Sequence, residues 1–248
     1  MATKDTARRE NPKNPYLSNL SRAGKDPYHM HKILFGGGSI KPEEISQLQF
    51  DDHAKITVTP ARDADGMSHT CFFLLPGIRN LKRKPVITDG CAGVGGNVLS
   101  FILSGFFSQV NAVEINENRA NMLQHNVNVI RKITPANIQK GSYNDLYSTL
   151  KQDIVFLDPP WGGVTYKVLD KIQLFLSDEN GQKHLAKIIK DLFLHTQTMY
   201  VVWKAPFNFD LQDMKEMTSE YGGDVLLLQH FSKYNLFYVA HPKLRISK

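Results

Sequence analysis

Val86-Ile87-Thr88-Asp89-Gly90-Cys91-Ala92-Gly93-Val94-Gly95-Gly96-Asn97 is the stretch that decides the fold of this 248-residue chain. Its first four residues predict a strand, the glycines after Asp89 predict a tight turn, and apolar residues from Val98 to Leu103 predict a helix. Glycines at such a turn let a ligand approach the backbone closely, and the start of the following helix favours a carboxylate or phosphate. The stretch therefore predicts an α/β protein with a ligand site at one edge of its sheet.

The chain after Pro85 alternates between strand-like and helix-like patterns. Apolar residues recur at helical spacing in four segments, 98–103, 120–130, 185–192 and 211–217. Short apolar runs predict strands at 86–89, 110–114, around Ile138, 154–157 and 199–203, and a final hairpin from 225–228 and 236–240. This alternation predicts a mostly parallel sheet with helices on both faces, to which the hairpin adds one antiparallel strand.

Three segments differ in composition. Residues 1–33 are polar and lack periodicity, which predicts a basic and mostly flexible arm. Residues 34–84 mix short apolar and polar pieces and predict a small N-terminal cap, with a strand end at 56–60 and a helix at 67–75. Residues 85–248 form the predicted main α/β domain.

The positive charge is concentrated at the start of the chain. The net charge is +6, and residues 1–34 contain seven Lys or Arg against three acids. A basic arm on a near-neutral body suits a polyanion such as RNA, although a merely solvated tail has the same composition.

Composition excludes several classes of protein. Two cysteines, Cys71 and Cys91, are too few for a disulfide scaffold and favour a reducing compartment. No Cys/His cluster has zinc spacing, so we expect no metal. Because no apolar run is long enough for a membrane span and the N-terminus lacks an apolar signal core, we expect an intracellular protein, nuclear or cytoplasmic, without membrane contact.

The glycine turn and the next strand supply a first group of candidate site residues. They are Asp89, Gly93, Gly95, Asn97 and, at the end of the next strand, Glu114. An acid at that second place can accept hydrogen bonds from both hydroxyls of a ribose. No Gly-Lys-Ser/Thr follows the turn, which excludes a P-loop. The group predicts a nucleoside cofactor and leaves NAD and S-adenosylmethionine both open.

The second group is Asp158-Pro159-Pro160-Trp161-Gly162-Gly163, directly after the predicted strand 154–157. Its prolines remove two backbone donors and leave carbonyl acceptors, Asp158 adds another acceptor, and Trp161 supplies a stacking face. Acceptors beside an aromatic plane suit the exocyclic amine of a nucleobase. A methyltransferase that acts on a base needs such a site to hold the amine, whereas a dehydrogenase does not. The group therefore favours S-adenosylmethionine over NAD as the cofactor. A rigid turn with a core tryptophan is the simpler alternative.

Positioning and stacking would carry the chemistry of such a site. Acceptors such as the Asp158 carboxylate and the Pro159 carbonyl can favour the pyramidal, reactive form of an aromatic amine, and alignment with the methyl group contributes most of the rate. Stacking on Trp161 is worth about 1–3 kcal/mol per base. A base that is already positively charged gains further by cation–π attraction.

Together these motifs resemble the trimethylguanosine synthase family, the RNA cap guanine-N2 methyltransferases. The resemblance rests on Phe156–Gly163 with Tyr166, on Asp89–Asn97 and on Thr57-Val58-Thr59-Pro60. It implies a Rossmann-like seven-stranded methyltransferase fold, in which residues 85–248 are the methyltransferase domain. It also implies S-adenosylmethionine as methyl donor and an N7-methylated guanosine RNA cap as acceptor.

The resemblance implies roles for single residues as well. Trp161 would stack on the charged 7-methylguanine, with Tyr166 close by. The methyl donor would be bound by Asp89, Gly93, Gly95, Asn97 and Glu114, with Thr57 and Thr59 near its amino-acid end and Ser142 and Tyr143 near its adenine.

The chain departs from the family pattern after its fifth predicted strand. Pro206-Phe207-Asn208 stands where the family often has Pro-Arg-Asn, so a phosphate-contacting arginine is missing. Lys204 or the basic arm would substitute for it, and Lys204 and Asn208 are expected to contact the substrate. A lysine at the end of a strand is otherwise more often solvated. Cellular eukaryotic members usually carry long extensions, so this chain suits a virus-encoded or protist enzyme.

The sequence therefore predicts a monomeric enzyme that uses S-adenosylmethionine to methylate the exocyclic N2 amine of the 7-methylguanosine cap, once or twice. One alternative is an adenine-N6 or guanine-N2 methyltransferase for internal bases of RNA or DNA. Another, of a different class, is an inactive cap-binding module. The presence of Asp89, Glu114 and Asp158 argues against an inactive module.

Overall fold

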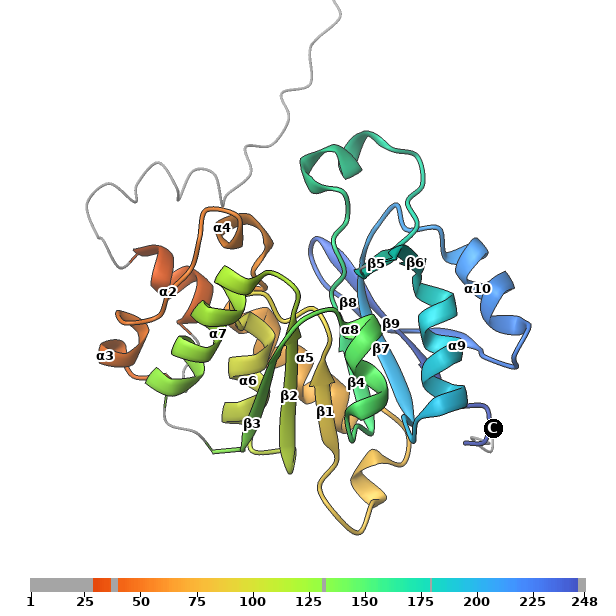
Figure 1. Ribbon diagram of the computed structural model, residues 1–248, viewed down its shortest axis with the longest axis horizontal. Coiled ribbons are helices and arrows are strands. Elements are labelled where there is room, and N and C mark those ends of the chain that lie inside the picture. Colours follow the sequence, from red (N-terminus) through yellow and green to blue (C-terminus); the bar gives the residue numbers. More distant parts are fainter. Residues whose placement is uncertain (1–28, 37–39, 131–132, 179, 245–248) are drawn as a thin grey trace, which may run out of the picture.

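A seven-stranded sheet lies at the centre of the computed structural model, which describes residues 29–36, 40–130, 133–178 and 180–244 (Figure 1). The strand order is β3-β2-β1-β4-β7-β9-β8. The bounds are β1 (Val86–Asp89), β2 (Gln109–Glu114), β3 (Ala136–Lys140), β4 (Ile154–Leu157), β7 (Tyr200–Pro206), β8 (Val225–His230) and β9 (Tyr234–Ala240). Strand β9 is antiparallel to both neighbours, and the other pairings are parallel. The predicted sheet with its closing hairpin is confirmed.

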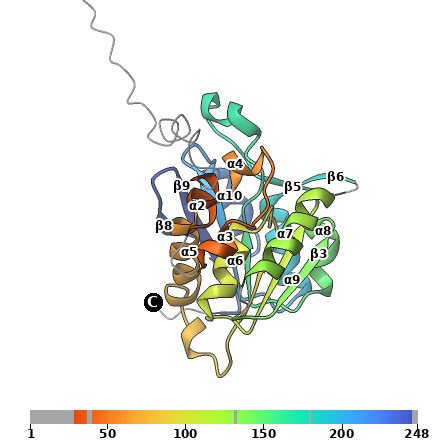
Figure 2. The same ribbon diagram turned by 90° about the vertical axis from the view of Figure 1, so that its left-hand side faces the viewer.

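Helices cover both faces of the sheet, and Figure 2 shows α5 and α9 on opposite sides. The first face carries α5 (Ala61–Phe73), α6 (Gly96–Ser104) and α7 (Glu117–Val129). The second carries α8 (Tyr143–Leu146), α9 (Leu185–His195) and α10 (Leu211–Ser219). The predicted α/β class and the four predicted helices are confirmed.

Strand β4 shows how the sequence fills both cores. Ile154 and Phe156 pack into the core of the first face, whereas Val155 and Leu157 pack into the core of the second, and all four are fully buried. Side chains alternate across a strand, so a strand with helices on both sides must be apolar throughout. This requirement explains the uninterrupted apolar run before Asp158.

The N-terminal segment packs on the first face and shares its core. It contains α2 (His29–Phe35), α3 (Pro42–Ile45), α4 (Ala54–Thr57) and the short 3-10 helix η2 (Ile78–Asn80), besides α5. Leu34, Phe35 and Met67 belong to the same buried cluster as Ile87 of β1. The segment predicted as a cap is therefore joined to the sheet through a continuous core.

Two local predictions in this part of the chain are wrong. Residues 29–33, expected within the flexible arm, belong to α2, which is anchored because Leu34 and Phe35 are buried; residues 1–28 lie outside the described residues. The predicted strand end at 56–60 is not a strand, because residues 56–57 belong to α4 and residues 58–60 form no regular element. The Asp51 carboxylate accepts a hydrogen bond from the backbone N–H of Ala54 at 2.7 Å and stabilises this helical turn.

A second, two-stranded sheet was not predicted. Strand β5 (Phe175–Asp178) pairs antiparallel with β6 (Gly181–His184). Only Leu176 and His184 of this hairpin are buried, so its sequence lacks the apolar alternation that marks a strand. Two 3-10 helices complete the fold, η3 (Tyr147–Thr149) and η4 (Gly163–Val168), the latter directly after the Trp161 motif.

Candidate active site

The carboxyl ends of β1 and β4 lie side by side at the centre of the sheet. Asp89 at the end of β1 is in register with Phe156, so Asp158 emerges just beyond it on the neighbouring strand. The strands that follow β1 in sequence, β2 and β3, lie on one side of it, and β4 lies on the other side, so the strand order reverses between β1 and β4. Ligands of open α/β sheets bind at such a switch point, outside the carboxyl ends of the strands.

The glycine turn after β1 is held open by backbone conformation and by Glu114. Gly93 (φ +54°) and Gly95 (φ +106°) adopt left-handed conformations that favour glycine, and Gly95 is the residue before α6. The Glu114 carboxylate accepts hydrogen bonds from the backbone N–H groups of Gly93 (2.7 Å) and Asn116 (2.8 Å). Glu114 thus ties the turn to the end of β2, and each oxygen keeps a lone pair for a ligand hydroxyl.

Two polar side chains beside the turn have buried acceptors without a donor. Asp89 is 1% exposed; its Oδ1 accepts from the backbone N–H of Cys91 at 3.1 Å, while its Oδ2 has no partner in the described part of the chain. The same holds for Oδ1 of Asn97, at the first turn of α6. A buried acceptor left unpaired costs free energy, so these atoms fit a ligand that brings hydrogen-bond donors.

The electrostatics of Asp89 also favour a cationic or donor-rich ligand. Burial raises the pKa of Asp89 to about 8, and the negative charges of Asp158 and Glu114 add to this effect. The ammonium group and ribose hydroxyls of S-adenosylmethionine are donors of the kind that this cluster lacks. The residues around the turn therefore fit that cofactor.

The two threonines predicted near the cofactor occupy different environments. Thr59 is 2% exposed, its hydroxyl oxygen accepts a hydrogen bond from Lys204 Nζ at 3.0 Å, and its carbonyl oxygen would lie 3.1 Å from a Cβ at Gly96. Thr59 thus abuts the start of α6. Thr57 is exposed, and its hydroxyl donates to the carbonyl of His53, the residue before α4. The structure brings Thr59, but not Thr57, to the other candidate residues.

Ser142 and Tyr143 lie at the start of α8, on the second face of the sheet. The Ser142 hydroxyl donates to the Ser177 carbonyl at 2.8 Å and caps α8. Tyr143 is buried, burial raises its pKa, and its ring lies so close to Gly90 that a Cβ there would be 2.8 Å from its Cγ. Both side chains therefore have structural partners, and Tyr143 packs against the glycine turn.

Asp158 and Lys204 form a buried ion pair at the acceptor side. Lys204 Nζ lies 2.5 Å from Asp158 Oδ2, and Lys204 is 4% exposed. The pair follows from the register, because Leu157 is opposite Trp203, and Asp158 and Lys204 are the residues that come next in the chain. The expectation of a solvated lysine at this strand end is wrong. Burial raises the pKa of Asp158, and the Lys204 charge opposes that rise.

Trp161 lies in a group of aromatic rings around the same lysine. Lys204 Nζ is 5.3 Å from the Trp161 ring centre and 4.7 Å from that of Tyr234. Tyr166 packs edge-to-face against Trp161, with ring centres 5.3 Å apart. Trp161 is half-buried, and its indole N–H has no partner among the described residues, whereas Trp203 is fully buried in the core as expected.

Asn208 fixes the segment that follows the Trp161 motif. Its side-chain amide donates to the carbonyls of Tyr166 (2.7 Å) and Leu169 (2.8 Å), across from β7 to the chain around η4. The carbonyl of Pro159, predicted as an amine acceptor, accepts no hydrogen bond within the described ranges. Asn208 thus acts on the position of Tyr166.

Sequence reasoning missed Tyr234 and the contact between Thr59 and Lys204. Tyr234 belongs to β9, and its hydroxyl donates to Asp63 of α5 at 2.5 Å. One signal for the lysine was present, since Lys204 is a charged residue within the otherwise apolar strand 200–206. Nothing in the sequence around Tyr234 sets it apart from other core aromatics.

Cys91 is not a nucleophile in this arrangement. Burial raises the pKa of its thiol well above the usual value, and the charges of Asp89, Asp158 and Glu114 raise it further. The thiol therefore stays protonated. Across residues 29–36, 40–130, 133–178 and 180–244, no three or more His, Cys, Asp or Glu side chains are grouped to hold a metal, and no helix is long and apolar enough to cross a bilayer.

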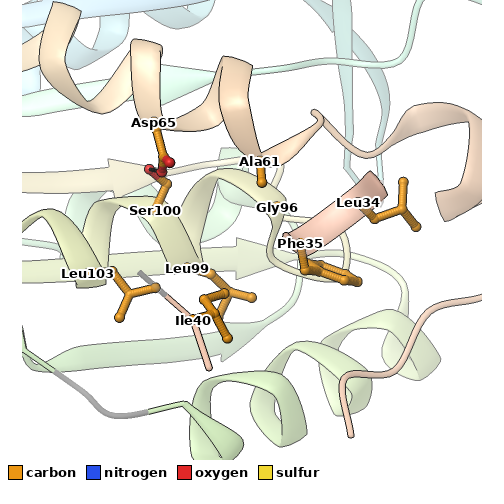
Figure 3. A pocket seen from close by; sticks show the side chains of 9 residues that line it. All are labelled: Leu34, Phe35, Ile40, Ala61, Asp65, Gly96, Leu99, Ser100 and Leu103. Carbon is orange, nitrogen blue, oxygen red and sulfur yellow. Dashed lines mark hydrogen bonds between the residues drawn. The ribbon is translucent and has the colours of Figure 1, made fainter. Parts of the chain in front are cut away.

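A small pocket adjoins the far side of the glycine turn, between α2, α5 and α6 (Figure 3). Its wall is apolar apart from Asp65 and Ser100, and the Ser100 hydroxyl donates to Asp65 at 2.8 Å. Gly96 reaches it, but none of the predicted site residues lines it. The pocket is thus separate from the cluster of Asp89, Asp158 and Trp161.

The sequence profile of the RNA cap guanine-N2 methyltransferases matches residues 84–238, more than half of the chain. The chain belongs to this family. The predicted family is therefore confirmed, and the matched range contains both the glycine turn and the Trp161 motif.

A viral protein is among the relatives of the chain. Uncharacterized protein L320 of Acanthamoeba polyphaga mimivirus is 33% identical over 142 residues, which cover 56% of this chain and 53% of that protein. The match thus spans about half the length of the viral relative. A viral relative fits one of the two predicted origins, a virus-encoded protein, and not specifically the other, a protist.

Solved structures of methyltransferases share the fold. A putative methyltransferase from Porphyromonas gingivalis superposes with a TM-score of 0.53 at 16% identity, over 91% of this chain and 57% of its own. A SAM-dependent methyltransferase from Agrobacterium tumefaciens gives 0.51 at 13% identity, over 79% and 66%. The predicted Rossmann-like methyltransferase fold is confirmed, and family and fold together support methylation with S-adenosylmethionine.

Proposed function

We propose that this protein methylates the exocyclic N2 amine of a 7-methylguanosine RNA cap with S-adenosylmethionine as methyl donor. The observation that carries the proposal is the juxtaposition of two clusters at the ends of β1 and β4. Asp89 offers a buried carboxylate oxygen without a donor, and Asp158 and Trp161 offer an acceptor beside an aromatic ring. The family match over residues 84–238 supports guanine N2 as the acceptor.

The residues at the end of β1 would bind the methyl donor. Asp89, Asn97 and Glu114 supply acceptors for its ammonium and ribose hydroxyls, and the backbone at Gly93 is open on the side where a Cβ would point. S-adenosylmethionine, when bound, supplies a methyl group on a positively charged sulfur, which is a good leaving group. No metal and no covalent enzyme intermediate is needed for this transfer.

The residues at the end of β4 would hold the acceptor amine. The Asp158 carboxylate and the Pro159 carbonyl accept from the amine hydrogens, which localises the nitrogen lone pair for attack on the methyl carbon. Trp161 stacks on the base, and a ring that carries the positive charge of 7-methylguanine is attracted to its π face. Holding both reactants in line accounts for most of the expected rate enhancement.

One observation favours an uncharged base instead. Lys204 already places a positive charge 5.3 Å from the centre of the Trp161 ring, which reduces the attraction of that ring for a second cation. The second candidate function is therefore guanine-N2 methylation of internal RNA bases, for which cation–π attraction is not required.

Incubation with methyl-labelled S-adenosylmethionine distinguishes these functions. The acceptors are 7-methyl-GTP, GTP, ATP and uncapped RNA, and mass spectrometry of the digested product locates the new methyl group. We expect label at N2 of 7-methyl-GTP and little in GTP. Label in GTP or uncapped RNA but not in 7-methyl-GTP would reject the cap. Label in none of them, with retained binding of 7-methyl-GTP, would indicate an inactive cap-binding module.

A further inference from the structure

Lys204 has a role that its proposed contact with cap phosphate does not explain. Its ammonium group has two oxygen partners, Asp158 Oδ2 at 2.5 Å and Thr59 Oγ1 at 3.0 Å, and the rings of Trp161 and Tyr234 face it. The side chain is 5% exposed. An ammonium group enclosed in this way has little access to a phosphate in solvent.

We propose that Lys204 is a positioning residue that keeps the Asp158 carboxylate ionised and fixes its Oδ2, so that Oδ1 accepts from the acceptor amine. This inference rests on the proposed amine methylation. Oδ1 of Asp158 accepts no hydrogen bond from the described residues, and the Asp158 side chain is 16% exposed. The ion pair therefore uses one carboxylate oxygen and leaves the other for a ligand.

The surroundings of Asp158 make a cation necessary. Asp89 of β1 lies near it, together with the protonated thiol of Cys91, and Glu114 of β2 lies near Asp89 and Cys91. Burial raises the pKa of Asp158, and Lys204 is the charge that lowers it again. Tyr234 of β9 faces the lysine rather than supplying a charge. Without Lys204, the buried carboxyl of Asp158 beside Asp89 would stay protonated up to a higher pH.

Ionisation of Asp158 matters for the transfer itself. As the amine nitrogen bonds to the methyl carbon, the carbon–sulfur bond breaks with its electron pair on sulfur, and the nitrogen becomes positively charged until one of its protons leaves to water. A carboxylate beside that nitrogen stabilises the developing charge. A neutral carboxyl group does not, so loss of ionisation lowers the rate.

Lys204 also joins the two halves of the site. Thr59 abuts the start of α6 beside the glycine turn, and Trp161 belongs to the acceptor motif. The same ammonium group contacts both. A shift of Lys204 would therefore change the place of Asp158 relative to the methyl donor.

The test is the pH profile of kcat/KM for the acceptor at saturating S-adenosylmethionine. We compare the wild type with Lys204→Met, Lys204→Arg and the double variant Lys204→Met/Asp158→Asn. In Lys204→Met the acid limb should move to higher pH by about 1–3 units, since an opposite charge at this distance lowers a carboxyl pKa by that amount. Lys204→Arg should restore the wild-type limb, because the charge is kept. The double variant should not show the acid limb that Lys204→Met moves to higher pH, because its residue 158 has no carboxyl group to titrate.

The titration of Asp89 must be distinguished from that of Asp158, because Lys204 also lowers the pKa of Asp89, which is about 8. The dissociation constant of S-adenosylmethionine is therefore measured at each pH, and any limb that survives in the double variant belongs to Asp89. Lys171→Met is the matched control, since Lys171 forms an exposed pair with Asp210 at 3.2 Å and should keep the wild-type profile.

Thermal unfolding checks that each variant is folded. Should Lys204→Met not fold, Lys204→Gln keeps a donor without the charge and is expected to show the same displaced limb. A uniformly lower rate with an unmoved limb in Lys204→Met or Lys204→Gln would overturn the proposal and leave Lys204 a packing residue. If the wild type methylates another base amine but not the cap, only the cap assignment is wrong. The pH profile is then measured with that other acceptor, and it still tests the role of Lys204. Label in no acceptor would contradict both proposals.

Discussion

The end of β1 and the end of β4 differ in how their charged groups are satisfied. At the end of β1, Asp89 Oδ2 and Asn97 Oδ1 are buried without donors. At the end of β4, Asp158 already has a buried lysine as partner, and the aromatic rings around it pack on one another. In the first region a bound ligand would satisfy the unpaired acceptors, whereas in the second most polar groups and rings already have partners within the protein.

This difference has an energetic meaning. Unpaired buried acceptors destabilise the protein alone and stabilise it once a donor-rich ligand is present, so the first region couples ligand binding to folding stability. A preassembled ion pair contributes little net stability but fixes geometry. We infer that affinity for the methyl donor resides at the end of β1 and orientation of the acceptor at the end of β4.

The largest effect is expected for Asp89→Asn. Loss of a charged hydrogen-bond acceptor costs about 1.5–3 kcal/mol, which weakens binding of S-adenosylmethionine by about 10- to 150-fold, as measured by equilibrium binding. The wild-type affinity should fall about tenfold per pH unit below the Asp89 pKa of about 8, because the carboxyl is then protonated, and this dependence should vanish in the variant. Retained pH dependence in Asp89→Asn would assign the titration to another group.

The same variant should be more stable than the wild type without ligand. The folded-state pKa of Asp89 lies above the ordinary value of 3.8, so ionisation penalises the folded state increasingly as the pH rises toward 8. Removing the carboxyl should raise the melting temperature at pH 8 by several degrees, and the gain should disappear near pH 4. A lower melting temperature at pH 8 would contradict the account of an unsatisfied carboxylate.

Trp161→Ala is expected to have the next largest effect, confined to the other region. Stacking on an aromatic side chain is worth about 1–3 kcal/mol, so kcat/KM for 7-methyl-GTP should fall by about 5- to 150-fold. Affinity for S-adenosylmethionine should change by less than about threefold, because the ring contacts Lys204, Tyr166 and Tyr234 rather than the glycine turn. Equal loss of both would make Trp161 a structural residue.

The smallest effects are expected for a pair of matched threonine variants. Thr59→Val removes the oxygen that accepts from Lys204 and should lower kcat/KM severalfold, since a typical hydrogen bond contributes about 1 kcal/mol. Thr57→Val, at an exposed hydroxyl bonded within α4, should stay within twofold of the wild type. Steady-state kinetics on both variants measures the contrast, and a larger effect of Thr57→Val would bring that side chain into the site.

The residues that carry each motif could be predicted, but the contact between two side chains on neighbouring strands could not. The glycine turn and Asp89 are contiguous, and Glu114 follows at the end of the next strand, so their chemistry is visible in the sequence. The ion pair between Asp158 and Lys204 joins residues 46 positions apart and depends on the register of β4 with β7. Register is set by packing on both faces and is not encoded locally.

The fold shows the same division. Strands buried on both faces can be recognised in the sequence as apolar runs, as at 154–157, because every side chain of such a strand packs into one of the two cores. The hairpin of β5 and β6 was not predicted because its strands bury only Leu176 and His184 and therefore lack the apolar alternation of a strand. Helix α4 was not predicted because the contact of Asp51 with Ala54 stabilises a helical turn that includes the start of the strand-like pattern.

Binding of S-adenosylmethionine and of 7-methyl-GTP to Asp89→Asn and Trp161→Ala, measured separately by titration calorimetry, tests the division between the two regions most directly. The account predicts a crossed result: Asp89→Asn loses S-adenosylmethionine and keeps 7-methyl-GTP, whereas Trp161→Ala loses 7-methyl-GTP and keeps S-adenosylmethionine. Loss of both ligands in both variants, with folding intact, would contradict it.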